Sequence, residues 1–308
     1  MPRCIARCGQ IMVLAIGAWA APTRAGAQES LDELAVRLAG MTAVSGYEQA
    51  MVDSLLPVLP GSTRDRAGSA VLDIGSGGSH TLIVCPIDEA GYVVGGIRAD
   101  GYLTLRRVGP GPGPRADERL QGQRVTVFGR KGAVPGVVGV RSVHLTRGRG
   151  PAPMFTLDDA FVDLGASSVA EVAALGVTVL SPVARAKAPH RYGSDLLAGP
   201  AVGRRAACAA LLSAARRPRT SAWIAVAFAV EQRFTGRGLL TLMHERGPFT
   251  RTILVDGESA PGRWDPGFGV VDSWLVPVRY PGTPVETISL TDLRALEQRL
   301  SSLIGGTP

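Results

Sequence analysis

The feature that most constrains the fold is a short, almost fully apolar segment at residues 81–85, with turn-forming residues on both sides. A strand that is apolar at successive positions is buried on both faces, which is typical of the middle of a sheet covered by helices. Residues 222–230 show the same pattern, and residues 204–216 and 290–303 have the apolar spacing of helices. The sequence therefore predicts an α/β fold, a sheet flanked by helices.

The composition and pattern of the sequence change between residues 101 and 183, where Gly and Pro are frequent and short β-type segments follow one another. Residues 124–128 and 134–140 are two of these segments. Such a stretch is typical of a small β-rich module. We expect this module, residues 101–183, to be inserted into a discontinuous α/β domain formed by residues 28–100 and 184–308.

The first 27 residues have the pattern of a secretory signal peptide. Arg3 and Arg7 form a short positive start, residues 11–21 are mostly apolar, and Ala25-Gly26-Ala27 places small residues at the cleavage spacing. An uncleaved anchor is the alternative, but the apolar run is too short to span a bilayer comfortably. We expect cleavage after Ala27, export to the periplasm or the extracellular space, and no stable membrane insertion.

The charge of the chain argues against a nucleic-acid partner. The formal net charge is +7, and loss of the signal peptide removes three Arg and no acid, which leaves +4. The Arg residues are scattered and do not form a basic stripe interleaved with aromatic residues. Nucleic-acid binding is therefore not expected.

Two cysteines remain after residue 27, Cys85 and Cys208, and each lies in an apolar run. An oxidising compartment would permit a disulfide between them. The apolar surroundings favour two buried free thiols instead.

Ligands of α/β proteins bind beyond the carboxyl ends of the strands, so polar residues there are candidate site residues. Asp88 and Asp256 each follow a predicted strand, and Asp195 precedes a predicted helix. The simplest role of Asp88 and Asp256 is to accept hydrogen bonds from neighbouring backbone amides. The simplest role of Asp195 is to face the N-terminus of the helix that follows it. Ser45 and Glu48, three residues apart, fit a capping box at a helix start.

Four further segments stand in order along the chain: Ser45-Gly46-Tyr47-Glu48, Ile87-Asp88-Glu89-Ala90-Gly91-Tyr92, Phe161-Val162-Asp163-Leu164-Gly165-Ala166, and Arg279-Tyr280 followed by Thr283-Pro284-Val285-Glu286. Together they resemble motifs of the glutamyl-aminopeptidase and deblocking-aminopeptidase family, some members of which were once labelled endoglucanases. The resemblance implies a zinc-peptidase-like α/β frame with a PDZ-like or β-barrel insertion. It also implies a site for two metal ions, such as zinc or cobalt, and assembly into homo-oligomers.

Part of the family's site is kept in this sequence. The aspartate that orients the first metal-binding histidine falls on Asp88. The bridging metal aspartate falls on Asp195, and the next metal aspartate falls on Asp256. The resemblance thus implies Asp195 and Asp256 as vestigial metal ligands.

The rest of the family's site is lost. The first and last histidine ligands fall on Pro86 and Gly282, and a metal-binding glutamate falls on Arg233. The general base falls on Gln232, whose amide cannot accept a proton usefully near neutral pH. A two-metal hydrolase needs about three protein ligands per ion, so we expect no cofactor and a site rebuilt as ion pairs between Arg233 and Asp195 or Asp256.

Three hypotheses follow. The first is an exported pseudoenzyme, a member of the family without catalysis, that binds peptides or protein subunits. The second is an active metallo-aminopeptidase with a remodelled one-metal site built from Asp88, Asp195, Asp256 and His190. The third is a structural protein whose inserted module mediates assembly.

Overall fold

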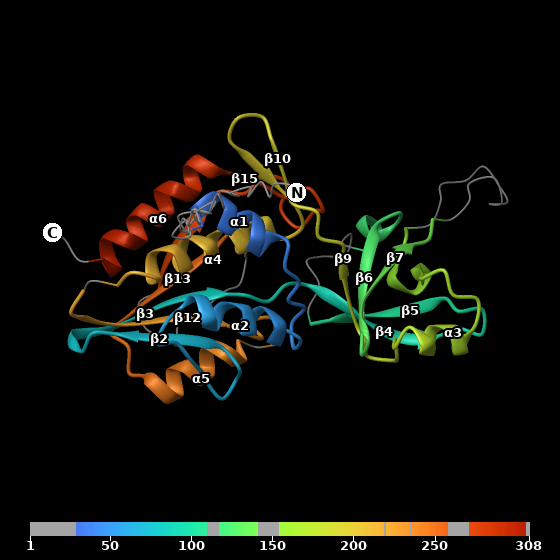
Figure 1. Ribbon diagram of the computed structural model, residues 1–308, viewed down its shortest axis with the longest axis horizontal. Coiled ribbons are helices and arrows are strands. Elements are labelled where there is room, and N and C mark those ends of the chain that lie inside the picture. Colours follow the sequence, from blue (N-terminus) through green and yellow to red (C-terminus); the bar gives the residue numbers. More distant parts are fainter. Residues whose placement is uncertain are drawn as a thin grey trace, which may run out of the picture.

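The computed structural model describes residues 29–109, 117–140, 154–218, 220–234, 236–257 and 271–305. The expected signal peptide, residues 1–27, lies outside the described residues. Figure 1 shows two lobes, a sheet flanked by helices and a smaller β-rich lobe beside it. Within the ranges given, no helix is long and apolar enough to cross a membrane.

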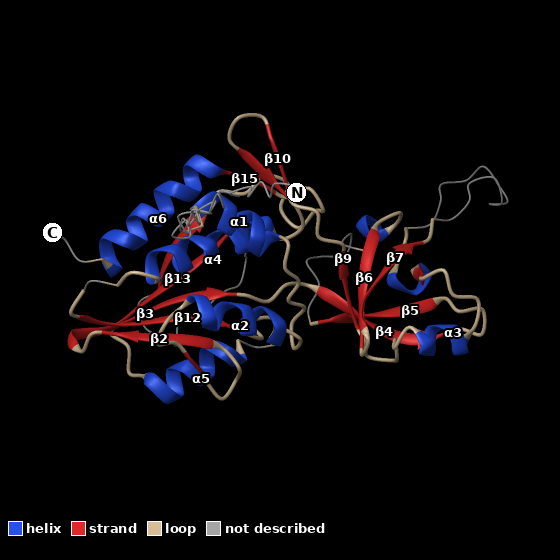
Figure 2. Ribbon diagram, viewed as in Figure 1, coloured by secondary structure: helices blue, strands red, loops and turns tan. Residues whose placement is uncertain are grey.

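A six-stranded sheet forms the centre of the larger lobe (Figure 2). Its strands are β1 (Thr63–Arg64), β2 (Ala70–Ile74), β3 (Gly77–Pro86), β12 (Ala222–Ala229), β13 (Arg251–Gly257) and β14 (Val271–Val276). Their order is β1-β2-β12-β3-β13-β14. The last four strands in this order run parallel to one another, whereas β2 is antiparallel to both β1 and β12. The two apolar segments of the sequence are thus neighbouring inner strands, and their carboxyl ends meet at one edge.

Helices cover both faces of this sheet (Figure 1). They are α1 (Leu31–Ala39), α2 (Gln49–Leu55), α4 (Val202–Ala215), α5 (Arg237–Arg246) and α6 (Leu290–Ile304), with a short 3₁₀ turn, η1 (Leu56–Val58). Because side chains alternate between the faces of a strand, Ile83 and Cys85 pack in the core beneath α1, α2, α4 and α6, whereas Leu82 and Val84 pack with the apolar residues of α5. A three-stranded sheet of β10 (His190–Tyr192), β11 (Leu196–Ala198) and β15 (Thr287–Ser289) completes the lobe.

The smaller lobe is a closed six-stranded barrel. Its strands are β4 (Gly91–Ile97), β5 (Leu103–Val108), β6 (Arg124–Gly129), β7 (Gly132–Val138), β8 (Phe161–Asp163) and β9 (Pro182–Arg185), joined with η2 (Glu118–Leu120), η3 (Leu157–Asp159) and α3 (Val169–Ala174). The expected β-rich insertion is present, but it begins at Gly91 rather than at residue 101. The buried pattern of β4 resembles that of a central sheet strand, so the sequence assigned it to the wrong lobe.

Cys85, at the end of β3, forms a disulfide with Cys208 of α4, with 5.5 Å between the Cα atoms. The expectation of two free thiols was therefore wrong. Both residues are completely buried, and apolar surroundings suit a buried disulfide as well as a buried thiol. The two cysteines form a disulfide because α4 packs across the end of β3, and the apolar pattern of the sequence alone does not reveal this proximity.

Candidate functional site

The N-terminus of α4 packs closely against the end of β13 because glycines face each other there. A Cβ added to Gly257 would lie 2.9 Å from the carbonyl carbon of Gly203. This close approach brings Arg204, the residue after Gly203, to the carboxyl ends of the parallel strands. Those ends carry the two predicted site residues Asp88 and Asp256.

Arg204 joins these two aspartates through its guanidinium group. Its Nε lies 3.0 Å from Oδ1 of Asp256 and its Nη2 lies 2.7 Å from Oδ2. Its Nη1 lies 3.0 Å from Oδ1 of Asp88 and 2.7 Å from the Asp88 carbonyl oxygen. Burial alone would lower the pKa of Arg204, but Asp256 and Asp88 outweigh burial and raise it. A permanent cation of the protein itself therefore forms ion pairs with both strand-end carboxylates.

Asp88 is completely buried and all of its polar contacts are made within the protein. Its Oδ2 accepts hydrogen bonds from the hydroxyl of Ser45, at 2.7 Å, and from the backbone N–H of Arg233, at 2.8 Å. The second bond is the amide contact that the sequence suggested for this residue. Arg204 binds the other oxygen of Asp88. Asp88 therefore links the end of β3 to three other segments: the loop before α2, the residues after β12, and α4.

Ser45 and Glu48 do not form the expected capping box. Glu48 stands at the start of α2 without a side-chain cap bond, and its Oε1 instead accepts the backbone N–H of Glu231, at 2.9 Å. Burial raises the pKa of Glu48 to about 7. The spacing is the same as in a capping box, but both side chains reach across to neighbouring strand ends rather than back to their own helix.

A second ionic cluster lies where the chain passes from the sheet into the barrel. Glu89 forms ion pairs with Lys187 and with Arg205, whose Nη2 lies 3.2 Å from Oε1 of Glu89. Arg205 is completely buried. Burial by itself would raise the pKa of Glu89, but Lys187 and Arg205 outweigh it and lower the pKa to about 2. None of these three residues was singled out from the sequence.

A buried carboxylate faces the start of α4. Glu286 accepts the backbone N–H of Gly203 at 2.9 Å and that of Gly282 at 3.1 Å. A negative charge is favourable at a helix N-terminus, and it offsets the two arginines that follow Gly203. Burial raises the pKa of Glu286.

Asp195 does not join the strand-end cluster. Its carboxylate accepts hydrogen bonds from the hydroxyls of Ser289, at 2.6 Å, and Thr291, at 3.0 Å, and lies 3.6 Å from Arg294. The hydrogen bond from Ser289 is the largest cause that lowers the pKa of Asp195. Asp195 thus binds residues at the start of α6. The sequence had suggested the start of the helix at residues 204–216, which corresponds to α4.

The ion pair expected of Arg233 is made by Arg204. Arg233 forms no ion pair with any described carboxylate, and its Nε is buried without a hydrogen-bond partner. The neighbouring Gln232 also has a buried, unpartnered amide oxygen. His190, offered as a replacement ligand, is exposed on β10.

The residues present do not fit a two-metal centre. Pro86, at the end of β3, has no ligand atom in its side chain, and Gly282 has none. Of the two metal-type aspartates, Asp256 is held by Arg204, a cation that occupies the carboxylate oxygens a metal would bind, and Asp195 binds Ser289 at the start of α6. Across the described ranges, no group of three or more His, Cys, Asp or Glu side chains could hold a metal ion.

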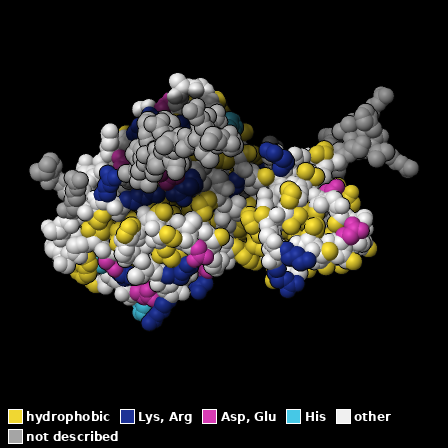
Figure 3. Space-filling model, viewed as in Figure 1, with side chains coloured by type: hydrophobic (Ala, Val, Ile, Leu, Met, Phe, Trp, Pro, Cys, Tyr) yellow, Lys and Arg dark blue, Asp and Glu magenta, His cyan; other side chains and the backbone are white. Residues whose placement is uncertain are grey.

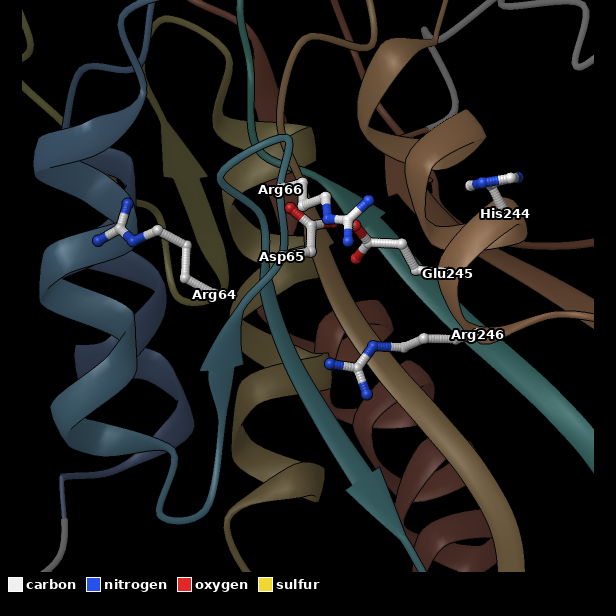
Figure 4. A pocket seen from close by; sticks show the side chains of 6 residues that line it. All are labelled: Arg64, Asp65, Arg66, His244, Glu245 and Arg246. Carbon is white, nitrogen blue, oxygen red and sulfur yellow. The ribbon is translucent and has the colours of Figure 1, made fainter.

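A shallow surface pocket lies near the C-terminal end of α5, away from Gln232. Figure 4 shows its lining side chains, with Asp65, Arg66 and Glu245 close together and His244 directed away from them. Arg66 pairs with Glu245 at 3.3 Å, and Arg246 pairs with Asp73. The pocket is a network of surface ion pairs.

The fold and the strand-end site define a peptidase-like α/β protein with an inserted barrel. The chain belongs to the M42 glutamyl aminopeptidase family, whose sequence profile matches residues 68–234. Aminopeptidases of this family depend on metal ions.

Two relatives support this assignment. The chain is 30% identical over 229 residues to SgcX of Escherichia coli, a protein provisionally named an aminopeptidase. The aligned residues make up 71% of this chain and 60% of SgcX. It is 29% identical over 176 residues to the lysyl aminopeptidase of Pyrococcus furiosus, and the aligned residues make up 54% of this chain and 50% of that enzyme. The chain thus spans between half and three-fifths of these two relatives.

Solved structures share the fold. An aminopeptidase from the archaeon Desulfurococcus kamchatkensis superimposes with a TM-score of 0.77 at 20% identity, over 90% of this chain and 95% of that one. The TET1 peptidase of Pyrococcus horikoshii superimposes with a TM-score of 0.76 at 21% identity, over 90% of this chain and 100% of that one. TET1 is described as able to assemble into a tetrahedron or a large octahedral shell.

Proposed function

We propose that this protein is an exported, non-catalytic member of the M42 family that binds peptides. The observation that carries the proposal is the Arg204 guanidinium, which forms ion pairs with both Asp88 and Asp256. Replacing a metal by an arginine keeps a positive charge beside the carboxylates but supplies neither an open coordination position nor an activated water.

The residue at the general-base position supports the same proposal. Gln232 is neutral and cannot take a proton from an attacking water near neutral pH. Loss of the base and of metal ligands in one chain removes the two groups on which a metal-dependent peptidase depends.

Activity measurements test the proposal directly. The mature chain, residues 28–308, is incubated with leucyl, lysyl and glutamyl anilides, with added zinc or cobalt and separately with a chelator. We expect no release of the aniline above the buffer rate under any condition, while the lysyl aminopeptidase of Pyrococcus furiosus serves as the positive control. Cleavage that the chelator abolishes would overturn the proposal and favour the active enzyme that the relatives' names suggest.

Export is part of the proposal, and the disulfide supports it, since disulfides persist in oxidising compartments. The pairing of Cys85 with Cys208 is consistent with a chain that folds outside the cytosol. Mass spectrometry of protein recovered from the periplasm or medium should give a chain that begins at Gln28. Recovery of the full-length chain from the cytosol, with both thiols free, would contradict export.

Assembly is a second candidate role, favoured by the likeness to the shell-forming TET1 peptidase. We propose that copies of this chain associate into a homo-oligomer. Light scattering of the mature protein at micromolar concentration should give a mass of several chains. A monomer mass would remove this role and leave the peptide-binding proposal in place.

A further inference from the structure

Two partly buried arginines near the strand ends stand out because they have no counter-ion among the described residues. In both Arg185, the last residue of β9, and Arg233, which follows β12, the Nε atom is buried and donates no hydrogen bond. Arg107, Arg205 and Arg246 also have a buried unpartnered nitrogen, but each forms an ion pair with an acid through its guanidinium group. Arg185 and Arg233 do not.

Arg233 follows β12 of the central sheet, and Arg185 ends β9, which lies on the side of the barrel that faces the larger lobe in Figure 1. A Cβ added to Gly109, just after barrel strand β5, would lie 3.4 Å from the Cβ of Arg233. Arg119 of the barrel crosses the junction between the two lobes, where its Nη1 donates to the carbonyl oxygen of Gly282 at 3.4 Å. Arg119 is exposed and, in the part of the chain described, also has no acidic partner.

The acids around this junction are already engaged. Asp88 and Asp256 bind Arg204, and Glu89 binds Lys187 and Arg205. Arg119, Arg185 and Arg233 therefore form no ion pair of their own with a described acid, and Glu89, Glu286, Asp88 and Asp256 act on Arg185 and Arg233 only from a distance.

Burial lowers the pKa of Arg185 and of Arg233. A guanidinium nevertheless stays protonated in proteins. A partly buried positive charge without a partner is costly, so an anion at the junction would be bound favourably. Lys and Arg side chains also gather in patches on both lobes of the face seen in Figure 3.

We propose that the junction formed by Arg119, Arg185 and Arg233 binds peptides through their carboxylate groups. Guanidinium groups match carboxylates because two parallel N–H donors can meet two oxygens. The carboxylates come from acidic side chains or from the peptide C-terminus. An N-terminal amine would be repelled by the same charges, so a blocked amine should bind as well as a free one. The inference rests on the proposed function only in that the peptide is retained rather than cleaved.

Four N-acetylated, fluorescently labelled hexapeptides test the inference with the mature protein at low salt. One is neutral with a free C-terminus, one is the same peptide amidated, one is amidated with three glutamates, and one is amidated with three lysines. We expect the first or the third to bind, with at least tenfold weaker binding at 300 mM than at 50 mM salt. Binding of the first alone identifies the terminal carboxylate, and binding of the third alone identifies acidic side chains. Equal binding of the amidated neutral peptide, or no binding at millimolar concentration, would overturn the inference.

Substitutions then locate the site. Arg233→Gln and Arg119→Gln should each weaken binding about tenfold or more, the effect of losing one charge-assisted hydrogen bond. Arg185→Lys keeps the positive charge but loses the two parallel N–H donors of the guanidinium group, and should weaken binding by a smaller factor. Arg66→Gln is the matched control, because Arg66 is 87% exposed and lies at the surface pocket. Circular dichroism confirms folding of each variant, and unchanged binding in the three junction variants would refute the site.

The two proposals fail separately. Chromatography of the peptides after incubation shows whether they are intact. Fragments would overturn the non-catalytic proposal while leaving the carboxylate site supported. Intact peptides that do not bind would overturn the carboxylate site and the peptide-binding role, while leaving the loss of catalysis supported.

Discussion

Arg204 and Asp256 form a two-pronged ion pair, with Nε 3.0 Å from one carboxylate oxygen and Nη2 2.7 Å from the other. The side chains are 13% and 2% exposed. Removing one member of such a pair leaves the other charge buried and uncompensated, which costs more than the intact pair contributes. The stability of the larger lobe should therefore depend on Arg204.

Arg204→Met should lower the free energy of unfolding by about 3–5 kcal/mol, because Asp88 and Asp256 lose their shared cation. Urea unfolding followed by circular dichroism measures the change. Arg66→Met, at an 87% exposed ion pair, is the control and should stay within about 0.5 kcal/mol of the parent protein. Equal effects of the two substitutions would show that Arg204 does not compensate the aspartates.

Purified mature protein should contain less than about 0.1 equivalent of zinc, cobalt or manganese after dialysis, because Arg204 occupies the carboxylates that a metal needs. Elemental analysis gives the content. A chelator should leave the melting temperature unchanged, since a ligand that binds only the folded state would raise it. Stoichiometric metal, or a melting temperature that falls with the chelator, would contradict the structure of this site.

Stability should fall as the pH rises from about 4.5 to about 7 because of Glu48. Burial raises the pKa of this carboxyl group to about 7 from an ordinary value of 4.5, so the folded protein holds the proton more tightly than the unfolded chain. The loss is complete above the folded-state pKa and amounts to roughly 3 kcal/mol at most. Glu48→Gln keeps an acceptor for the Glu231 amide and should remove this pH dependence.

Urea titrations of the parent protein and of Glu48→Gln between pH 4 and pH 8 provide the test. The difference in unfolding free energy should grow in favour of the variant as the pH rises through this window. A difference that is constant with pH would mean that Glu48 does not titrate there.

The Cys85–Cys208 disulfide joins residues 123 apart in sequence. In the chain-entropy account, closing a loop of that length contributes about 4–5 kcal/mol. The double variant Cys85→Ser with Cys208→Ser should lose stability on this scale, and a reductant should destabilise the parent protein but not the variant. A thiol reagent should find no free thiol in denatured mature protein, and two thiols would rule the disulfide out.

The sequence predicted the architecture because burial patterns carry that information. The apolar runs at β3 and β12 are the inner strands, and the Gly- and Pro-rich stretch contains most of the barrel. Asp88 and Asp256 were placed correctly at strand ends, since parallel strands bring their ends together.

The cation of the site was missed for a physical reason. The family resemblance implied that Asp195 bridges the site, but its carboxylate binds Ser289 and Thr291 at the start of α6. Arg204 and Arg205 belong to a predicted helix whose charged residues were taken as ordinary. One signal was available. Two arginines in the first turn of an almost wholly apolar helix oppose its dipole, so they need buried acidic partners, which here are Asp88, Asp256 and Glu89.

The chain leaves the sheet for the barrel through Asp88 and Glu89 and returns through Lys187, and Glu89 and Lys187 are paired. Asp88 therefore belongs both to the strand-end site and to the neck between the lobes. The Glu89–Lys187 ion pair therefore ties the outgoing and the returning crossing of the chain together.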